Sequence, residues 1–216
     1  MISPLLANVY LHEVVDIWFE HMVKPRMRGP AFLVRYADDF VMVFKFESDA
    51  RRVAEVIPKR FTKYGLTLHP EKTRLLNFTR PQGRNESKSF DLLGFTHYWS
   101  KSHRGFWVVK RRTMAKRMRR SLASVQAWCR RHRHQSVQTQ HFHLSRVIRG
   151  HCQYYGITGN SQQLHQYREG VRKIWKKWLK RRSNAAARKG REWWGTLCAR
   201  FPLPPARAAH SVLRHT

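Results

Sequence analysis

The chain has 216 residues and is strongly basic, with 43 Lys and Arg against 13 Asp and Glu and a formal net charge of +30. A protein with this charge needs a polyanion to neutralise it, and nucleic acid is the first partner to expect. Apolar residues make up 42% and aromatic residues 12% of the chain, which is too much for a disordered basic tail. The composition therefore predicts a folded, nucleic-acid-binding protein.

Membrane insertion, secretion and structural metal binding are not expected. The most apolar stretch, residues 4–22, carries Glu13, Asp16 and Glu20, which do not suit a bilayer. We find no charged segment followed by an apolar one, as a signal peptide would have. Three widely spaced cysteines and 13 histidines show neither a disulfide framework nor zinc-finger spacing. These features favour a reducing compartment.

The charge is distributed unevenly along the chain. Residues 1–100 contain 15 Lys and Arg against 11 Asp and Glu, whereas residues 101–216 contain 28 against 2. This asymmetry favours two units with different tasks. The stretches most similar to linkers are residues 80–89 and 182–190.

The residue pattern of the first half of the chain predicts a mixture of helices and short strands. Apolar residues recur at helical spacing over residues 3–18. Two β-prone runs, 33–36 and 40–44, flank Ala37-Asp38-Asp39, which predicts a tight hairpin. A helix is expected over residues 48–64, where Gly65 would end it. Further strands are predicted at residues 66–68, 74–78, 90–95 and 106–110.

The second half predicts a bundle of basic helices. After Thr113 the apolar residues follow helical spacing. Aromatic residues such as Trp175 and Trp178 share a helix with many cations, and we expect these rings to lie in the core. The helices are expected at about residues 113–131, 140–155, 161–182 and 190–200. The fold class is therefore α+β, with a sheet and helices followed by a basic helical domain.

Asp38 and Asp39 are the most informative pair of residues in the chain. They lie within a run of Leu, Val, Phe and Met, where carboxylates are costly on a strand unless a cation binds them. At a hairpin tip both carboxylates can point toward one site, and such oxygen ligands suit Mg²⁺. A solvated turn is the alternative, because Asp is favoured in turns.

Five segments resemble, in the same order, the reverse transcriptases encoded by group II introns, which also act as maturases. ISPLLANVYLH (Ile2–His12) resembles the helix after the family's glycine-rich loop, and RYADDFVM (Arg35–Met42) resembles its catalytic hairpin. GLTLHPEKTRL (Gly65–Leu75) resembles the next palm motif, and FDLLGF (Phe90–Phe95) resembles the primer grip. RGHCQYYGITGNS (Arg149–Ser161) resembles the thumb, or maturase domain. The ordered set is much more specific than any single motif.

The resemblance implies a domain organisation and a function. Residues 1–112 would be a partial reverse-transcriptase palm, residues 113–205 a thumb/maturase domain that binds RNA, and residues 206–216 a tail. The activity would be RNA-directed DNA synthesis with two Mg²⁺ ions, together with binding of intron RNA to assist splicing and mobility. The implied partners are group II intron RNA, target DNA and deoxynucleoside triphosphates. The implied location is the bacterial cytoplasm, in association with nucleic acid and not with a membrane.

The resemblance also assigns roles to individual residues. Asp38 would be the ligand shared by both Mg²⁺ ions, and Asp39 would support the site. Tyr36 and Ala37 would line the floor near the primer terminus and the incoming nucleotide. Lys72 would neutralise or protonate the pyrophosphate leaving group, although an ordinary turn lysine is the alternative. The residues that would hold the primer strand, or pack in the core, are Leu93, Gly94 and Phe95.

Two blocks of cations are expected to contact RNA. Residues 110–120 contain seven basic residues and no acidic one, which favours phosphate contacts over a merely solvated face. The second block lies on the helix expected at residues 161–182. The predicted RNA-binding residues are Lys110, Arg111, Arg112, Lys116, Arg117, Arg119, Arg120, Arg172, Lys173, Lys176, Lys177, Lys180 and Arg181.

The sequence begins after three features of the family. These are the fingers, the glycine-rich loop and the strand that carries the first of three catalytic aspartates, and Met1 stands where the family usually has valine. Two divalent ions about 4 Å apart repel by roughly 17 kcal/mol at an effective dielectric near 20, and Asp38 and Asp39 supply only two negative charges. We therefore expect little polymerase activity from the chain alone, and an exposed sheet edge.

Two alternatives to an active polymerase stay open. The chain could be a truncated, non-catalytic maturase-like remnant that only binds RNA. It could also be one half of a split polymerase that an N-terminal half completes in trans.

Overall fold

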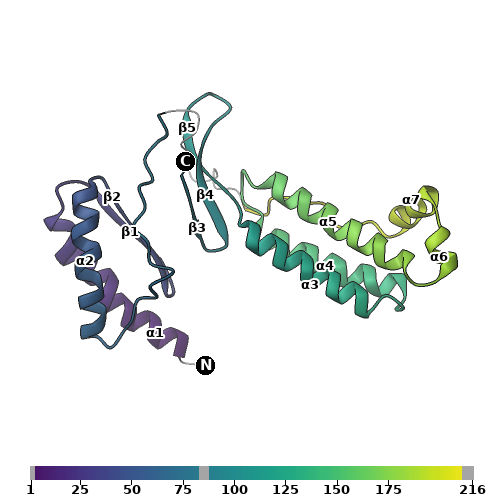
Figure 1. The fold of residues 1–216 in the computed structure, drawn as a ribbon, viewed down its shortest axis with the longest axis horizontal. Coiled ribbons are helices and arrows are strands. Elements are labelled where there is room, and N and C mark those ends of the chain that lie inside the picture. Colours follow the sequence, from purple (N-terminus) through teal and green to yellow (C-terminus); the bar gives the residue numbers. More distant parts are fainter. Residues whose placement is uncertain (1–2, 83–87, 211–216) are drawn as a thin grey trace. The chain divides into compact units, whose positions relative to one another are not determined.

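The computed structural model describes residues 3–82 and 88–210 and divides the chain into two compact units, residues 1–81 and 82–216 (Figure 1). Helices and antiparallel sheets are followed by a helical region, so the predicted α+β class is confirmed. The division falls earlier than the boundary predicted at residue 112. The second sheet therefore belongs to the same unit as the basic helices.

The first unit begins with a helical path that changes from α-helix to π-helix and ends in a short 3₁₀ turn. The segments are α1 (Ser3–Leu11), η1 (His12–Ile17), η2 (Phe19–Val23) and η3 (Lys24–Arg26). η1 and η2 are π-helical, a conformation that is rare and occurs often at functional sites. Both segments point apolar side chains into the core of the unit, and the fully buried ones are Val14, Val15 and Phe19.

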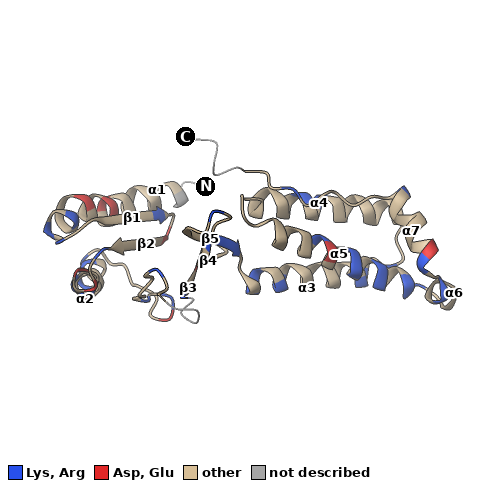
Figure 2. Cartoon of the chain, turned by 90° about the horizontal axis from the view of Figure 1, so that it is seen from above, with Lys and Arg blue, Asp and Glu red and all other residues tan. Residues whose placement is uncertain are grey.

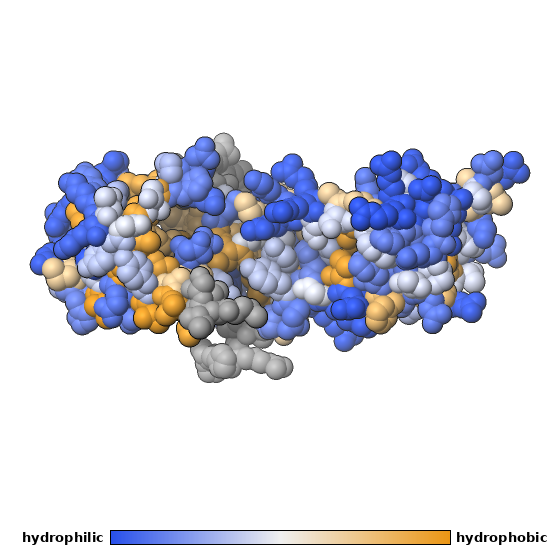
Figure 3. Space-filling view, turned by 90° about the horizontal axis from the view of Figure 1, so that it is seen from below, coloured by the Kyte–Doolittle hydropathy of each residue, from blue (hydrophilic) through white to orange (hydrophobic). Residues whose placement is uncertain are grey.

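A two-stranded hairpin packs against this helical path. Its strands are β1 (Ala31–Tyr36) and β2 (Asp39–Phe44), as the sequence predicts. Because side chains alternate along a strand, Ala31 and Leu33 pack on the core while Phe32 and Val34 stay exposed. Apolar side chains gather on the surface of this unit, at the left of the view in Figure 3.

The helix α2 (Glu47–Lys63) completes the first core. Val53, Ile57 and Phe61 recur at helical spacing and are buried in it. Pro58 lies inside the helix without ending it. The helix ends at Lys63, and Gly65, the residue predicted to end it, follows the cap residue Tyr64 with a φ of +65° that suits glycine.

The strands predicted at residues 66–68 and 74–78 are wrong. Both segments are without regular structure, although Leu66 and Leu68 still pack against the first core. An apolar run becomes a strand only where another strand pairs with it, and the sheet of this unit consists of β1 and β2.

The sheet of the second unit is a three-stranded meander. Its strands are β3 (Ser89–Leu92), β4 (Phe95–Lys101) and β5 (Trp107–Thr113). The single strand predicted at residues 90–95 is wrong, because a two-residue turn at Leu93 and Gly94 divides it. Both turn residues have positive φ, at 51° and 79°.

The basic helices pack around one apolar core in the second unit. They are α3 (Ala115–Arg131), α4 (Val137–Tyr155), α5 (Ser161–Lys180), α6 (Asn184–Arg188) and α7 (Arg191–Arg200), and α6 occupies part of the predicted linker at 182–190. The prediction that Trp175 and Trp178 lie in the core is confirmed. Trp175 donates its indole N–H to the side-chain oxygen of buried Gln140 at 3.0 Å, so these two buried side chains satisfy each other.

Within the described residues, helices long and apolar enough to cross a membrane do not occur.

Candidate active site and nucleic-acid interface

The tip of the β1–β2 hairpin brings four of the predicted site residues together. Tyr36 pairs with Asp39 at the end of the ladder, and Ala37 and Asp38 form the two-residue turn between them. All four residues are exposed. Ala37 has a φ of +54°, although glycine is the residue that usually takes positive φ in hairpin turns. The turn therefore presents two adjacent carboxylates on a backbone that alanine does not favour by itself.

The Asp38 and Asp39 carboxylates fit a hard divalent cation. Neither has an ion pair or a side-chain hydrogen bond with any residue that the structure describes, so their oxygens remain available. Mg²⁺ commonly takes one or two carboxylates and completes its shell with water and substrate phosphates. No group of three or more His, Cys, Asp and Glu side chains suitable for a metal occurs among residues 3–82 and 88–210. Mg²⁺ at the tip would therefore need oxygen ligands beyond these two.

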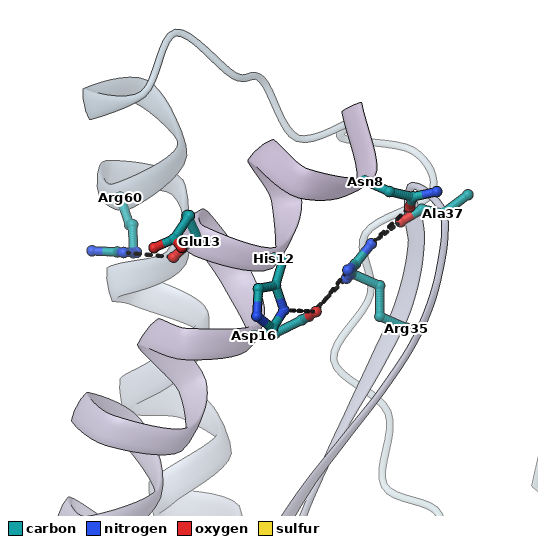
Figure 4. A network of polar contacts seen from close by, with 7 residues as sticks. All are labelled: Asn8, His12, Glu13, Asp16, Arg35, Ala37 and Arg60. Carbon is teal, nitrogen blue, oxygen red and sulfur yellow. Dashed lines mark hydrogen bonds and ion pairs between the residues drawn. The ribbon is translucent and has the colours of Figure 1, made fainter. Parts of the chain in front are cut away.

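Arg35 contacts the turn from the core side of the hairpin (Figure 4). Its Nη1 donates to the carbonyl oxygen of Ala37 at 2.9 Å. Its Nε and Nη2 donate to the two carboxylate oxygens of Asp16 on η1, at 2.7 and 2.6 Å. The hydrogen bonds from Arg35 hold the pKa of Asp16 below its usual value, and the same pair raises the pKa of Arg35. The ion pair thus joins η1 to the hairpin tip.

Sequence reasoning missed Arg35, although a signal was present. Residues 31, 33 and 35 share the core-facing side of β1, and Arg35 is the one cation among them. A cation at such a position needs a buried partner. Arg60 of α2 was also missed, and it donates to the carbonyl of Val14 in η1 at 2.7 Å.

Lys72 lies in the turn that Pro70, Glu71 and Lys72 form after α2. Its backbone N–H donates to the carbonyl of His69 at 3.1 Å. The side chain is exposed, and neither an ion pair nor a hydrogen bond joins it to another residue in the described part of the chain. The turn geometry agrees with the simpler alternative, and the catalytic role of Lys72 stays a prediction.

The predicted primer-grip residues form the turn between β3 and β4 in the second unit. The turn packs on the end of α4, where the hydroxyl of Tyr154 donates to the carbonyl of Leu93 at 3.1 Å. Phe95 stacks on Tyr154 and meets Tyr155 edge-on, with ring centroids 6.2 and 5.3 Å apart. A Cβ on Gly94 would lie 3.0 Å from the Tyr155 hydroxyl. Two tyrosines of the thumb-like motif therefore fix this turn, a contact that the sequence did not predict.

Asn160 is a second residue that joins the sheet to the helices. Its side-chain nitrogen donates to the hydroxyl of Thr113 and to the carbonyl of Tyr155, at 2.8 and 2.9 Å. Its side-chain oxygen accepts the backbone N–H of Thr113 at 3.0 Å. Asn160 is only 1% exposed. The end of β5 and the α4–α5 connection are therefore fixed to each other.

The first turns of α3 form a strip of cations (Figure 2). Lys116, Arg117, Arg119 and Arg120 are exposed, while Met118 between them is buried. Ion pairs from residues 110–120 are absent from the described part of the chain. These side chains are thus available for phosphates, and their contact with RNA stays a prediction.

The second predicted block, on α5, is less open than the first. Arg172 donates from Nε to Glu169 at 2.9 Å, which supplies an acidic partner that sequence reasoning had not considered. Lys176 lies over the ring of Trp194, and Arg181 lies over Trp178. The remaining members, Lys173, Lys177 and Lys180, are exposed or half-buried.

Comparison with protein families relates the first part of the chain to a known family. The search of curated proteins finds no match to the chain. Residues 1–97 match the family model described as reverse transcriptase (RNA-dependent DNA polymerase). The matched segment contains the whole first unit, β3 and the first three residues of β4, and so both predicted catalytic aspartates and the predicted primer-grip turn. Residues 1–97 are therefore similar to a reverse transcriptase, and the match supports that family for the chain.

Proposed function

We propose that the chain is part of a group II intron-encoded reverse transcriptase that also acts as a maturase. The observation that carries the proposal is the hairpin tip, which presents Asp38 and Asp39 side by side without protein partners, within a segment that matches the reverse transcriptase family. Two adjacent, exposed carboxylates at a hairpin tip are what a nucleotidyl transferase needs to hold divalent cations against phosphates.

In the proposed reaction the primer 3′-hydroxyl loses its proton to water and its oxygen bonds to the α-phosphorus of a deoxynucleoside triphosphate, while the bond from that phosphorus to the pyrophosphate oxygen breaks. Bound Mg²⁺ would supply neutralisation of the phosphate charge and would lower the pKa of the 3′-hydroxyl. Asp38 would bind both ions and Asp39 would support them, while Tyr36 and Ala37 would form the floor under the primer terminus. Lys72 would give a proton to the leaving pyrophosphate.

The basic strip of α3 and the exposed cations of α5 would bind the backbone of structured intron RNA. Four exposed cations on two turns of a helix, with no acidic partner in the described residues, support this part of the proposal. Structured RNA is recognised largely through its phosphates and its shape, which suits a strip of Lys and Arg.

The test of the polymerase proposal is primer extension on an RNA template with Mg²⁺. The 216-residue chain is assayed alone and together with any upstream segment that its reading frame encodes. Asp38→Ala should abolish whatever extension is seen, whereas Arg51→Lys, at an exposed ion pair on α2, should not. Extension that survives Asp38→Ala contradicts the proposal.

The same variants separate the remaining alternatives. A non-catalytic RNA-binding remnant would bind intron RNA equally well with and without Asp38→Ala and would extend no primer in either preparation. A split polymerase would extend a primer only when the upstream segment is supplied as a separate chain.

A further inference from the structure

We infer that Arg35 is a positioning residue that holds the Ala37–Asp38 turn in the conformation that presents the two carboxylates. The inference rests on the proposed function for its consequence, which is metal binding at Asp38 and Asp39. The hydrogen bond by which Arg35 holds the turn does not depend on that function.

The alternation of the hairpin brings Arg35 to this place. Arg35 follows Ala31 and Leu33 on the side of β1 that faces η1, and its side chain is only 13% exposed. A guanidinium carries five N–H donors in a planar fork. Two of its nitrogens bind the carboxylate of Asp16, and the third binds the carbonyl of Ala37 and, at 3.2 Å, the side-chain oxygen of Asn8.

The backbone of Ala37 needs a neighbouring group to hold its conformation. Alanine with a φ of +54° lies in the left-handed region, which a residue with a Cβ does not favour. Such conformations persist when neighbouring groups hold them, and they cluster at functional sites. A charge-assisted hydrogen bond from Arg35 to this carbonyl acts on the peptide that joins Ala37 to Asp38. It therefore fixes the direction in which Asp38 leaves the turn.

Asp16 neutralises the charge of Arg35 in this arrangement. Asp16 takes two guanidinium nitrogens, and Nδ1 of His12 lies 3.1 Å from its Oδ2 on the far side. Because Asp16 neutralises the guanidinium, Arg35 makes no ion pair with Asp38 or Asp39 in the described part of the chain. The carboxylates at the tip thus stay available for a cation although an arginine lies beneath them.

Stability alone is a weak explanation for this pair. A half-buried ion pair contributes little to folding, because the cost of removing charges from water offsets their attraction. The apolar contacts of β1 and β2 with Val15, Phe19 and α2 already hold the hairpin to the helices.

The experiment uses the 216-residue chain, Mn²⁺ as the probe and two variants. Arg35→Lys keeps the charge but cannot bind Asp16 and the carbonyl together, and Asp16→Asn keeps the shape but loses the ion pair. Arg51→Lys is the control, because Arg51 also binds a carboxylate, that of Glu47, but in a solvent-exposed pair within α2. Paramagnetic broadening of backbone amide signals locates the bound Mn²⁺, and amide hydrogen exchange reports the order of the turn.

The wild type and Arg51→Lys should show Mn²⁺ broadening centred on Asp38 and Asp39. Arg35→Lys and Asp16→Asn should weaken Mn²⁺ binding roughly tenfold, the effect of one charge-assisted hydrogen bond. Exchange at Asp38 and Asp39 should accelerate, while the core amides of Val14 and Val15 remain protected. A purely structural pair would lower protection throughout the unit instead. If either variant unfolds the unit, the other one decides.

Two other results separate the inference from the proposed function. If wild type and both variants bind Mn²⁺ equally at the tip, Arg35 has no positioning role and the metal site stands. If the wild type shows no broadening at Asp38 and Asp39, the proposed metal site fails, and exchange alone then decides. Faster exchange at the tip in Arg35→Lys supports the positioning role, and unchanged exchange overturns it.

Discussion

The basic strip of α3 predicts a specific salt dependence of RNA binding. Replacing Lys116, Arg117, Arg119 and Arg120 by Gln removes four exposed cations and leaves the buried contacts of Met118 intact. Each phosphate neutralised contributes about 0.7 to 0.9 to the slope of log affinity against log salt. If all four cations contact phosphates, the slope should become shallower by about 3.

The assay is fluorescence anisotropy with a labelled, structured RNA, titrated at several KCl concentrations. Between about 50 and 200 mM salt, a difference of about 3 in slope means that wild-type affinity falls roughly 60-fold more than that of the variant. The control replaces four exposed cations of the first unit by Gln, which changes the net charge equally. These control residues are Lys45, Lys59, Lys63 and Arg80.

An equal change of slope in the control would show that total charge, and not the strip on α3, governs binding. An unchanged slope in the α3 variant would show that these four cations remain solvated when RNA binds. Either result would refute the assignment of α3 as a phosphate-binding face.

Three further predictions concern the stability of the second unit, measured by urea unfolding. Gly94→Ala should lower the free energy of unfolding by about 2 kcal/mol, and by more than Gly105→Ala does. Both glycines have a similar positive φ, +79° and +81°, but only at Gly94 would the new Cβ meet Tyr155. Equal losses in the two variants would count against the contact with Tyr155. Burial lowers the pKa of His151 to about 4, so the unfolded chain takes up the proton first as the pH falls below about 6.5. The free energy of unfolding should then decrease between pH 6.5 and 4 by on the order of 2 kcal/mol, and His151→Phe should lessen this decrease. Trp175→Ala should cost about 3 to 5 kcal/mol, since the ring is fully buried, and a loss below about 1 kcal/mol would contradict the core described here.

Local pattern was sufficient to predict the hairpin that carries the candidate site. The β-prone runs on either side of Ala37-Asp38-Asp39 identify both strands, because alternation and turn residues are properties of neighbouring positions. The pattern was not sufficient at residues 66–68 and 74–78, since a strand also needs a partner that the run itself does not reveal. The division of FDLLGF into two strands depends on Leu93 taking positive φ, which leucine seldom does.

Contacts between residues distant in sequence were the other part that could not be predicted. A cation on the core side of β1 signals a need for a partner, but nothing in the sequence identifies Asp16, 19 positions earlier, as that partner. The packing of Tyr154 on the β3–β4 turn joins positions 61 apart. Such pairs depend on how helices and sheets pack, which periodicity does not specify.

The central claim is that Asp38 and Asp39 form the divalent-cation site of a reverse transcriptase, and iron-directed cleavage of the backbone tests it most directly. Fe²⁺ substitutes for Mg²⁺ and, with ascorbate and peroxide, cuts the chain beside its binding site, which mass spectrometry then locates. The account predicts cuts within residues 35–40 that excess Mg²⁺ suppresses and that Asp38→Asn removes. Cuts that occur only near histidines, or that neither Mg²⁺ nor Asp38→Asn affects, would contradict it.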